Sequence, residues 1–183
     1  MEQEVKPRRS PRKSWQKEVR EWVVSIVMAI GIALLIQNYA FAQAQVHQSS
    51  MYGTLEEGQR LVEDKLSYRF SEPERGDIVI IDGPESDLRL IKRLIALPGD
   101  TVDMREGAVY LNGAKLDEPY ANGQTFPNGL ELPLTVPEGK VFVLGDNRER
   151  SIDSRQLGLI ASSSLEGKAV FRIWPLQKFG GLH

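Results

Sequence analysis

A single apolar run near the N-terminus limits most strongly what this chain can fold into. The run extends from Trp22 to Tyr39 (WVVSIVMAIGIALLIQNY) and contains no charged residue. An α-helix rises about 1.5 Å per residue, so a helix over this run would be roughly 27 Å long. The hydrocarbon core of a bilayer is about 30 Å thick. The run therefore predicts one transmembrane helix over residues 22–39.

The charges on either side of the run predict its orientation. Basic residues are crowded before it, and none follows it until Arg60. Because Lys and Arg accumulate on the cytoplasmic side of a membrane span, we expect residues 1–21 to form a basic cytoplasmic tail. Residues 40–183 would then form the extracytoplasmic domain of a single-pass protein of the cell membrane. The basic residues before the run are Lys6, Arg8, Arg9, Arg12, Lys13, Lys17 and Arg20.

The same segment also fits a cleavable signal peptide, in which a basic stretch and an apolar stretch precede small residues. Ala40, Ala42 and Ala44 supply such small residues. We favour an uncleaved anchor, because cleavage after Ala42 or Ala44 would leave Ser49 and Ser50 almost at a new N-terminus. The sequence leaves open whether the chain cleaves itself near these alanines.

The composition excludes several other functions. The chain has 183 residues, of which 41% are hydrophobic and 26% charged, a balance typical of globular proteins. Its formal net charge of −2 gives no basic surface for nucleic acid. The absence of cysteine excludes a disulfide and a thiol nucleophile, and His47 and His183 alone cannot form a histidine-rich zinc site. We therefore expect neither a metal nor another cofactor.

The residues after the apolar run show the patterns of strands and turns. Short runs rich in Val and Ile are separated by Gly, Pro and Asn. Asn112-Gly113 is a strong signal for a two-residue hairpin turn. We expect a mainly β, antiparallel barrel-like extracytoplasmic domain with an exposed loop over Pro119–Pro133. The expected strands are Arg75–Asp82, Arg89–Leu97, residues 101–104, 108–111 and 114–116, Val141–Asn147 and, as the last, Ala169–Trp174.

Two residues of this domain, Ser50 and Lys92, can support nucleophilic catalysis. A Ser-His-Asp triad has no well-placed base, because His47 lies only three residues before Ser50 and His183 ends the chain. A lysine can act as the base instead, provided that its amine is neutral near pH 7. Burial must then lower its pKa by about three units from the usual value of about 10.4.

The sequence around Lys92 is compatible with such burial. Side chains alternate along a strand, so Leu90, Lys92 and Leu94 would share one face, while Ile91 and Arg93 would share the other. Lys92 would thus lie between two leucines. A lysine on a strand more commonly faces solvent, and a serine in a turn is commonly only a turn residue. These patterns alone therefore do not establish a catalytic pair.

Three blocks of sequence, taken in order, resemble the motifs of one family. The blocks resemble those of type I signal peptidases, the membrane-bound Ser-Lys endopeptidases of bacteria. The resemblance extends from about Trp22 to Trp174, and a fourth block, RGDIVII, resembles a further family motif. The three blocks are SSMYGTL (Ser49–Leu55), IKRLIALPGD (Ile91–Asp100) and GDNRERSIDSR (Gly145–Arg155).

The resemblance implies roles for individual residues. Ser50 matches the family's nucleophile, Met51 lies beside it near the substrate, and Lys92 matches the general base. Ser151 matches the serine that hydrogen-bonds the catalytic lysine, and Asp153 matches the aspartate that supports this arrangement.

Two further matches are expected to be structural. Asp146 and Arg155 correspond to family residues that we interpret as ion-paired near the site.

The resemblance also implies a reaction and its substrates. The backbone N–H of Ser50 would stabilise the oxyanion of an acyl transfer reaction. The implied substrates are secretory preproteins, cleaved after small residues at the first and third positions before the bond, and the implied partners are these signal peptides and membrane lipid.

The chain departs from the family pattern at two positions. Gly53 replaces the usual proline, which removes a restraint on φ or allows a positive φ that proline forbids. Gln48 stands two residues before the nucleophile, where some members have a serine that completes the oxyanion hole and others a glycine. Gln48 can donate through its amide or point away, and loss of one oxyanion donor costs roughly 10²- to 10³-fold in rate.

Three other functions remain as alternatives. A non-catalytic or weakly active homologue would bind preproteins without processing them efficiently, although retention of Ser50, Lys92, Ser151 and Asp153 argues against it. A self-cleaving repressor-type Ser-Lys peptidase would be expected to have a DNA-binding or cytoplasmic module in place of the anchor. A membrane-tethered β domain with a structural role would need none of these four residues.

Overall fold

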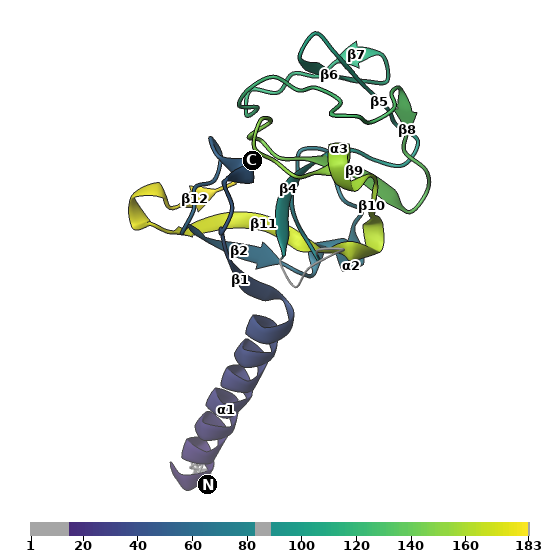
Figure 1. The fold of residues 1–183 in the computed structure, drawn as a ribbon. Coiled ribbons are helices and arrows are strands. Elements are labelled where there is room, and N and C mark those ends of the chain that lie inside the picture. The colour runs from purple at the N-terminus through teal and green to yellow at the C-terminus, as the bar shows by residue number, and fades with distance from the viewer. Residues whose placement is uncertain (1–14, 83–88, 183) are drawn as a thin grey trace, which may run out of the picture. The chain divides into compact units, whose positions relative to one another are not determined.

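The computed structural model describes residues 15–82 and 89–182, without the side chains of residues 35–39. The chain separates into two compact units, Met1–Asn38 and Tyr39–His183. The first contains helix α1 (Trp15–Tyr39), which continues just into the second. The second unit is mainly β, as predicted, and it holds every candidate site residue (Figure 1).

Helix α1 includes the predicted anchor. Trp22, Val27 and Met28 are each more than half exposed in it. Across the part of the chain that the structure describes, no helix combines the length and the apolar character needed to cross a membrane. Residues 1–14 of the predicted basic tail lie outside the described residues, as do the side chains of residues 35–39 within the predicted span.

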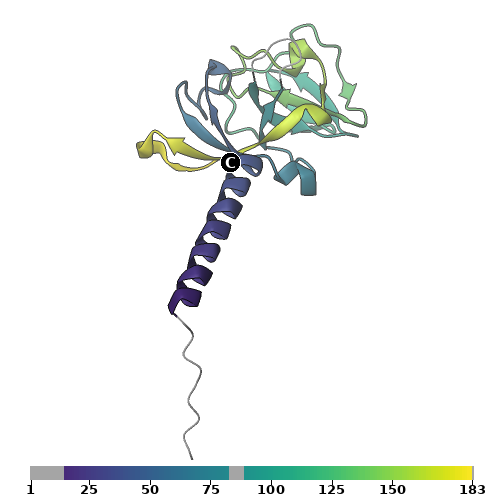
Figure 2. The same cartoon turned by 90° about the horizontal axis from the view of Figure 1, so that it is seen from below.

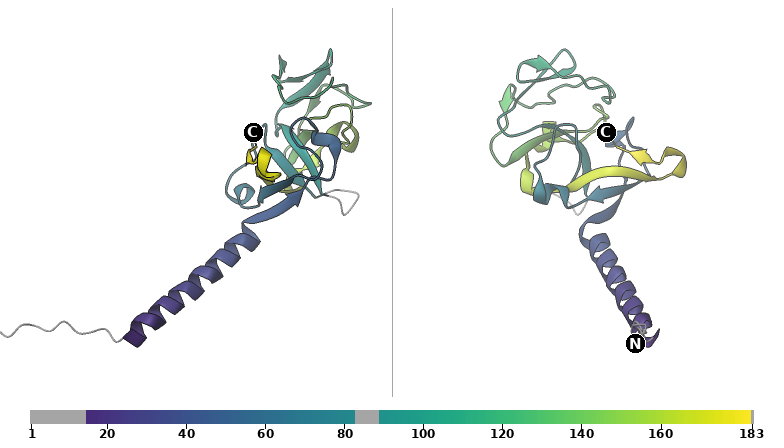
Figure 3. Two further views of the ribbon diagram at one scale, coloured as in Figure 1. Left: turned by 90° about the vertical axis from the view of Figure 1, so that its left-hand side faces the viewer. Right: turned by 180° about the vertical axis from the view of Figure 1, so that it is seen from behind.

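The larger of two sheets has eight strands in the order β1-β2-β11-β3-β4-β9-β10, with β12 added beside β11. All the pairings are antiparallel, and the sheet curls around its buried side (Figures 1 and 3). The β11–β12 hairpin projects from one side of it (Figure 2). The strands are β1 Phe41–Gln45, β2 Arg60–Asp64, β3 Ile78–Ile81, β4 Leu90–Ala96, β9 Lys140–Leu144, β10 Ile160–Ala161, β11 Leu165–Trp174 and β12 Gly180–Gly181.

The smaller sheet contains the predicted hairpins. Its strands run in the order β7-β6-β5-β8, and Asn112 and Gly113 take the φ values of 53° and 83° that a tight turn between β6 and β7 requires. Val102 and Val109 of this sheet share one apolar cluster with Phe142 of β9, which joins the two sheets. The strands are β5 Thr101–Arg105, β6 Ala108–Leu111, β7 Ala114–Lys115 and β8 Leu134–Thr135.

The described helices of the second unit are short, and one of them carries the candidate nucleophile. The 3-10 turn η1 covers Ser49–Met51. The other short helices are α2 Ser67–Phe70, α3 Ser154–Leu157, η2 Ser162–Ser164 and η3 Leu176–Lys178.

The sequence patterns did not predict β1, β2, β8, β10 or β12, and they misplaced the last strand; β8, β10 and β12 have only two residues each, too few for a recognisable pattern. β1 and β2 are half polar, because each buries only one face, so they lack the apolar runs that revealed β3 and β4. The predicted last strand was wrong, since β12 follows β11. Ala42 and Ala44 lie inside β1, where they pair with Glu63 and Leu61 of β2.

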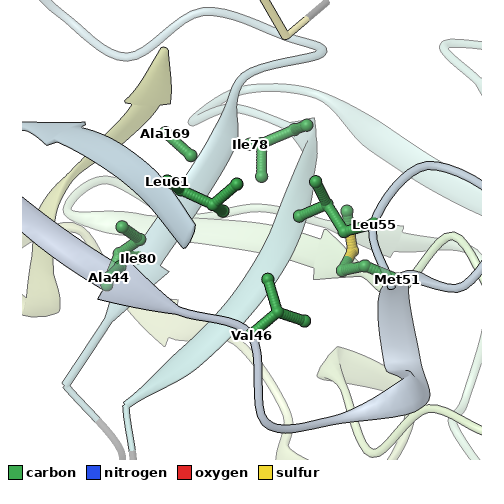
Figure 4. Packing of buried hydrophobic residues seen from close by; sticks show 8 residues of the cluster. All are labelled: Ala44, Val46, Met51, Leu55, Leu61, Ile78, Ile80 and Ala169. Carbon is green, nitrogen blue, oxygen red and sulfur yellow. The ribbon is translucent and has the colours of Figure 1, made fainter. Parts of the chain in front are cut away.

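An apolar cluster holds η1 against the larger sheet. Met51 and Leu55 point toward Ile78 of β3, with Val46 beside them, and all of these side chains are buried (Figure 4). Ile91 of β4 packs against the same cluster. Burial of one such side chain stabilises the fold by about 1.5–3 kcal/mol, so the turn that carries Ser50 is fixed by the core on its C-terminal side.

Candidate active site

Ser50 lies in η1 and is held from two sides. On one side Met51 and Leu55 are packed in the core. On the other side Asn147 donates from its backbone N–H to the Ser50 carbonyl at 2.9 Å and from Nδ2 to the Ser49 carbonyl at 3.0 Å. These contacts fix the backbone on which the Ser50 hydroxyl is carried.

Lys92 brings its amine directly to that hydroxyl. Its side chain is 1% exposed, and Nζ lies 2.7 Å from Ser50 Oγ. Lys92 pairs across strands with Val79, which belongs to the same apolar cluster as Leu94, with Leu90 packed against it. Directly paired residues on adjacent strands share a face. The predicted apolar face around Lys92 is therefore present.

Burial changes the chemistry of the Lys92 amine. It lowers the pKa of Lys92 from 10.5 to about 8, against the charge of Asp153, which acts to raise it, and with the charge of Arg155, which lowers it further. Among the described residues, the only hydrogen-bond partner of Nζ is the Ser50 hydroxyl, so no carboxylate directly stabilises the charged form. A substantial fraction of the amine is consequently neutral near pH 8.

Ser151 and Asp153 are buried close to this pair, but neither hydrogen-bonds Lys92. The Ser151 hydroxyl makes no hydrogen bond of standard geometry with a described residue, although it lies close enough to Asp153 to help lower the pKa of that carboxyl group. Asp153 accepts hydrogen bonds from Arg155 at 2.8 and 2.9 Å and from the Gly145 N–H at 3.0 Å. Burial raises the Asp153 pKa, but the hydrogen bonds and charge of Arg155, together with the hydrogen bond from the Gly145 N–H and the nearby Ser151 hydroxyl, outweigh burial and hold it below its usual value.

Gly145, at the end of β9, is a site residue that sequence reasoning did not single out. A Cβ at this position would collide with Ser151 Oγ and would lie 2.5 Å from the Ser50 carbonyl oxygen. Only glycine allows the chain to pass between these two serines. The glycine of the GDN sequence was a possible signal for this role, since a glycine in or next to a strand commonly marks a place where another part of the chain approaches the backbone closely.

The opposite side of β4 carries a second buried cation. Arg93 donates from Nε and Nη2 to the two carboxylate oxygens of Asp146, at 2.9 and 2.8 Å, and its guanidinium lies 3.9 Å from the centre of the Tyr120 ring. Thr54 donates a further hydrogen bond to Asp146 at 2.5 Å. Asp146 thus connects β4 to the segment after η1. Arg155, the other residue interpreted as structural, pairs with Asp153.

The two departures from the family pattern have definite places in the structure. Gly53 has a φ of 104°, which proline cannot adopt and which strains any side chain. Gln48 is extended and makes no capping hydrogen bond with its side chain. It lines a small hollow of about 20 Å³ together with Ser50 and Met51.

The structure therefore brings Ser50 and Lys92 into direct contact and places Gln48 and Met51 on the same hollow. It sets Ser151 and Asp153 beside the pair without a hydrogen bond to the amine. Within the described residues, no group of three or more His, Asp or Glu side chains is arranged to hold a metal ion. The arrangement supplies a hydroxyl in contact with a buried amine, which is the geometry needed for a base-activated nucleophile.

Comparisons with known proteins identify similar sequences over most of the chain. Residues 19–174 match the family model described as signal peptidase, peptidase S26. Signal peptidase I of Bacillus licheniformis is 44% identical over 167 residues, which cover 86% of this chain and 90% of that protein. Signal peptidase I T of Bacillus subtilis is 43% identical, with 86% of each chain covered.

A solved structure of a signal peptidase I from Enterococcus faecalis is also similar to part of the chain. Its sequence is 42% identical to the matched part. The match covers 54% of this chain and 97% of that one, with a TM-score of 0.48.

Proposed function

Because this chain belongs to the S26 family of signal peptidases and is a serine peptidase, we propose that it removes signal peptides from secreted preproteins with Ser50 as nucleophile and Lys92 as general base. The 2.7 Å contact between Lys92 Nζ and Ser50 Oγ carries this proposal. It falls within the range of about 2.6–3.2 Å at which a base can take a proton from a nucleophile.

The reaction begins with the neutral amine. Its lone pair accepts the Ser50 hydroxyl proton while Oγ forms a bond to the carbonyl carbon of the peptide. The resulting Lys92 ammonium then gives that proton to the leaving nitrogen, and the C–N bond breaks. In the second half, the neutral amine takes a proton from water, the hydroxide attacks the ester, and the proton returns to Ser50 Oγ.

The oxyanion and the acyl segment have candidate binding groups beside Ser50. The Ser50 backbone N–H would donate to the oxyanion, and the Gln48 amide lines the same hollow. Space of about 20 Å³ there supports a preference for small side chains before the cleaved bond, because larger ones are excluded sterically. Cleavage after small residues, as in Ala-x-Ala, is the expected specificity.

An extended substrate can add to the edge of β4. The first residues of β4 pair with β3, whereas β9 pairs with β4 only from Arg93 onward. Leu90 to Lys92 therefore have one edge that β9 does not cover. Backbone hydrogen bonds along this edge would align a preprotein with the Ser50 hydroxyl.

We also propose that residues 22–39 anchor the enzyme in the cell membrane as a single pass, with the basic N-terminus in the cytoplasm. The apolar run and the basic residues before it support this, as do the exposed apolar side chains of α1, such as Trp22, Val27 and Met28. Enzyme and preprotein would then share one bilayer, which raises their effective concentration.

The test uses the full chain in detergent and a preprotein peptide with an Ala-x-Ala site. Ser50→Ala should lower kcat/KM by at least about 10³-fold, because the nucleophile is removed. Ser163→Ala, which changes an exposed serine of η2, should retain the wild-type rate. Cleavage by Ser50→Ala at the wild-type rate would rule out the mechanism, and the absence of cleavage by the wild-type chain would favour a homologue that only binds preproteins.

A further inference from the structure

A second hollow lies on the other side of the turn that carries Ser50. Its volume is about 350 Å³, which falls in the range of about 300–1,000 Å³ typical of ligand sites. The mechanism above does not use it. Its lining residues are Ser49, Tyr52, Asn122, Gly123, Asn147, Glu149 and Arg150.

The 3-10 turn η1 separates this hollow from the small one. Ser50 and Met51 line the small hollow, whereas Ser49 and Tyr52, which flank them in sequence, line the larger one. A peptide whose carbonyl carbon reaches Ser50 Oγ must extend away from it in two directions. One direction leads into the small hollow, and the larger hollow is the built space available for the other.

The walls of the larger hollow are fixed relative to Ser50. Asn147 is hydrogen-bonded to the carbonyls of Ser49 and Ser50. Asn122 donates from its N–H to the Asp146 carbonyl at 2.7 Å and accepts from the Arg148 N–H at 2.9 Å. Two segments far from Ser50 in sequence are therefore bonded to each other, and one of them, at Asn147, is bonded to the nucleophile's own backbone, as a substrate site requires.

Several side chains in this hollow are available for a ligand. Tyr52 is 55% exposed, and Glu149 and Arg150 are exposed as well. Within residues 15–82 and 89–182, neither Glu149 nor Arg150 makes a side-chain hydrogen bond or an ion pair. The buried Arg148, which precedes them in sequence, is different, since its guanidinium already donates to Glu118 and Thr125.

Of the two free charges, Glu149 has the more defined position. Its side chain lies against Gly123, where an added Cβ would be 2.9 Å from Glu149 Cγ and 3.2 Å from Cδ. This contact places the Glu149 carboxylate on the wall of the hollow. A cationic side chain entering here would meet the Glu149 carboxylate and the exposed Tyr52 side chain, whose aromatic ring can also attract cations.

We propose that this hollow binds the segment that leaves after cleavage, the first residues of the mature protein, and that Glu149 and Tyr52 favour a cationic side chain in that segment. The inference rests on the proposed function, because it needs Ser50 as the point of acyl transfer. The acyl segment requires small residues and fits the small hollow, so the larger and more polar hollow is assigned to the leaving segment.

The experiment compares three peptides that share one Ala-x-Ala site and differ only in the second residue after the cleaved bond, which is Lys, Gln or Glu. For each enzyme, kcat/KM for the Lys peptide is divided by kcat/KM for the Glu peptide. The wild-type ratio should exceed one, and Glu149→Gln should lower it about twofold to fivefold, as expected for an exposed ion pair. Glu138→Gln, on a different part of the surface, should keep the wild-type ratio.

The ratio separates this inference from the proposed function. If the Gln peptide is cleaved in a Ser50-dependent manner but the Lys-to-Glu ratio is the same for wild type and Glu149→Gln, the peptidase mechanism stands and the leaving-segment site is wrong. If both glutamate variants lower the ratio equally, the effect is a general one of net charge, and the assignment to this hollow is again wrong. If the wild-type chain cleaves no peptide, both proposals fail.

Discussion

Lys92 and Arg93 are neighbours on β4, and both are cations with only 1% of their surface exposed. Arg93 is paired in two places with Asp146 and lies against the Tyr120 ring. Lys92 has no carboxylate in hydrogen-bond contact within the described residues and touches the Ser50 hydroxyl instead. The same strand thus buries one cation with its counter-charge and the next one without.

This difference between Arg93 and Lys92 shows that a buried basic side chain can either stabilise the fold or supply a reactive group. A buried charge is tolerated when it is paired and fully hydrogen-bonded, and the pairing of Arg93 with Asp146 makes it part of the structural frame. A buried amine without such a partner releases its proton more readily, and the pKa of Lys92 accordingly falls to about 8. One side of β4 therefore holds the site together, and the other supplies the base.

The largest expected effect comes from Lys92→Met. Loss of the base should lower kcat/KM by about 10³- to 10⁴-fold. The fold should become more stable below pH 8, because folding lowers the Lys92 pKa and the buried amine then opposes folding by an amount on the order of 3 kcal/mol. That gain should disappear as the pH rises from about 8 to 10.5. Peptide cleavage and urea unfolding at pH 6 and pH 10.5 would measure both effects.

Arg93→Met should have the opposite profile. It leaves Asp146 buried without its cation, so the free energy of unfolding should fall by about 3–5 kcal/mol. Urea unfolding at pH 7, where Lys92→Met is expected to be stabilised, provides the matched comparison. If the two variants shifted stability in the same direction and by similar amounts, the distinction between the two sides of β4 would not hold.

The pH dependence of cleavage should follow the titration of the Lys92 amine. Since the neutral amine is the active form, kcat/KM should rise about tenfold per unit of pH below about 8 and level off above it. Between pH 6 and pH 8 this amounts to an increase of roughly 50- to 100-fold. A rate that is constant over this range would show that no group with the properties of Lys92 limits the reaction.

A smaller effect is expected from Ser151→Ala. The Ser151 hydroxyl is buried without a hydrogen bond of standard geometry, so its removal should change stability by no more than about 1 kcal/mol. If the hydroxyl orients the amine once substrate is bound, kcat should fall about tenfold with KM unchanged. A fall in stability instead of kcat would place Ser151 with the structural group around Arg93.

The sequence predicted much of the site because its two central residues follow simple rules. Alternation along residues 90–94 placed Lys92 on an apolar face, and the Asn112-Gly113 pair fixed a hairpin. The resemblance in the three motifs supplied Ser50 as the partner of Lys92. Their contact nevertheless depends on chain segments 42 residues apart, which no local pattern determines.

Other features could not be read from the sequence, because they depend on which neighbours the fold supplies. The sequence placed Arg93 on the strand face opposite Lys92 but gave it no partner, since Asp146 lies 53 residues away in the chain. Asp153 was expected to support the arrangement of Ser151 and Lys92, and the motif did not reveal that its carboxylate is also paired with Arg155, two residues further on. β2 was missed because Glu63 is fully buried there with Arg89 as its ion-pair partner, and a glutamate does not mark a buried strand.

The proposed mechanism depends on a Lys92 amine that contacts Ser50 and loses its proton well below the pH at which an ordinary lysine does, so the decisive experiment is a titration of this amine in the intact protein. Lysine labelled with ¹⁵N at Nζ and ¹³C at Cε would be observed by NMR from pH 6 to pH 11, with the Lys92 signal assigned by its absence in Lys92→Met. The Lys92 signal should titrate with a midpoint near pH 8. A Lys92 signal that titrates with a midpoint near pH 10.4, like that of an exposed lysine, would contradict the proposed mechanism.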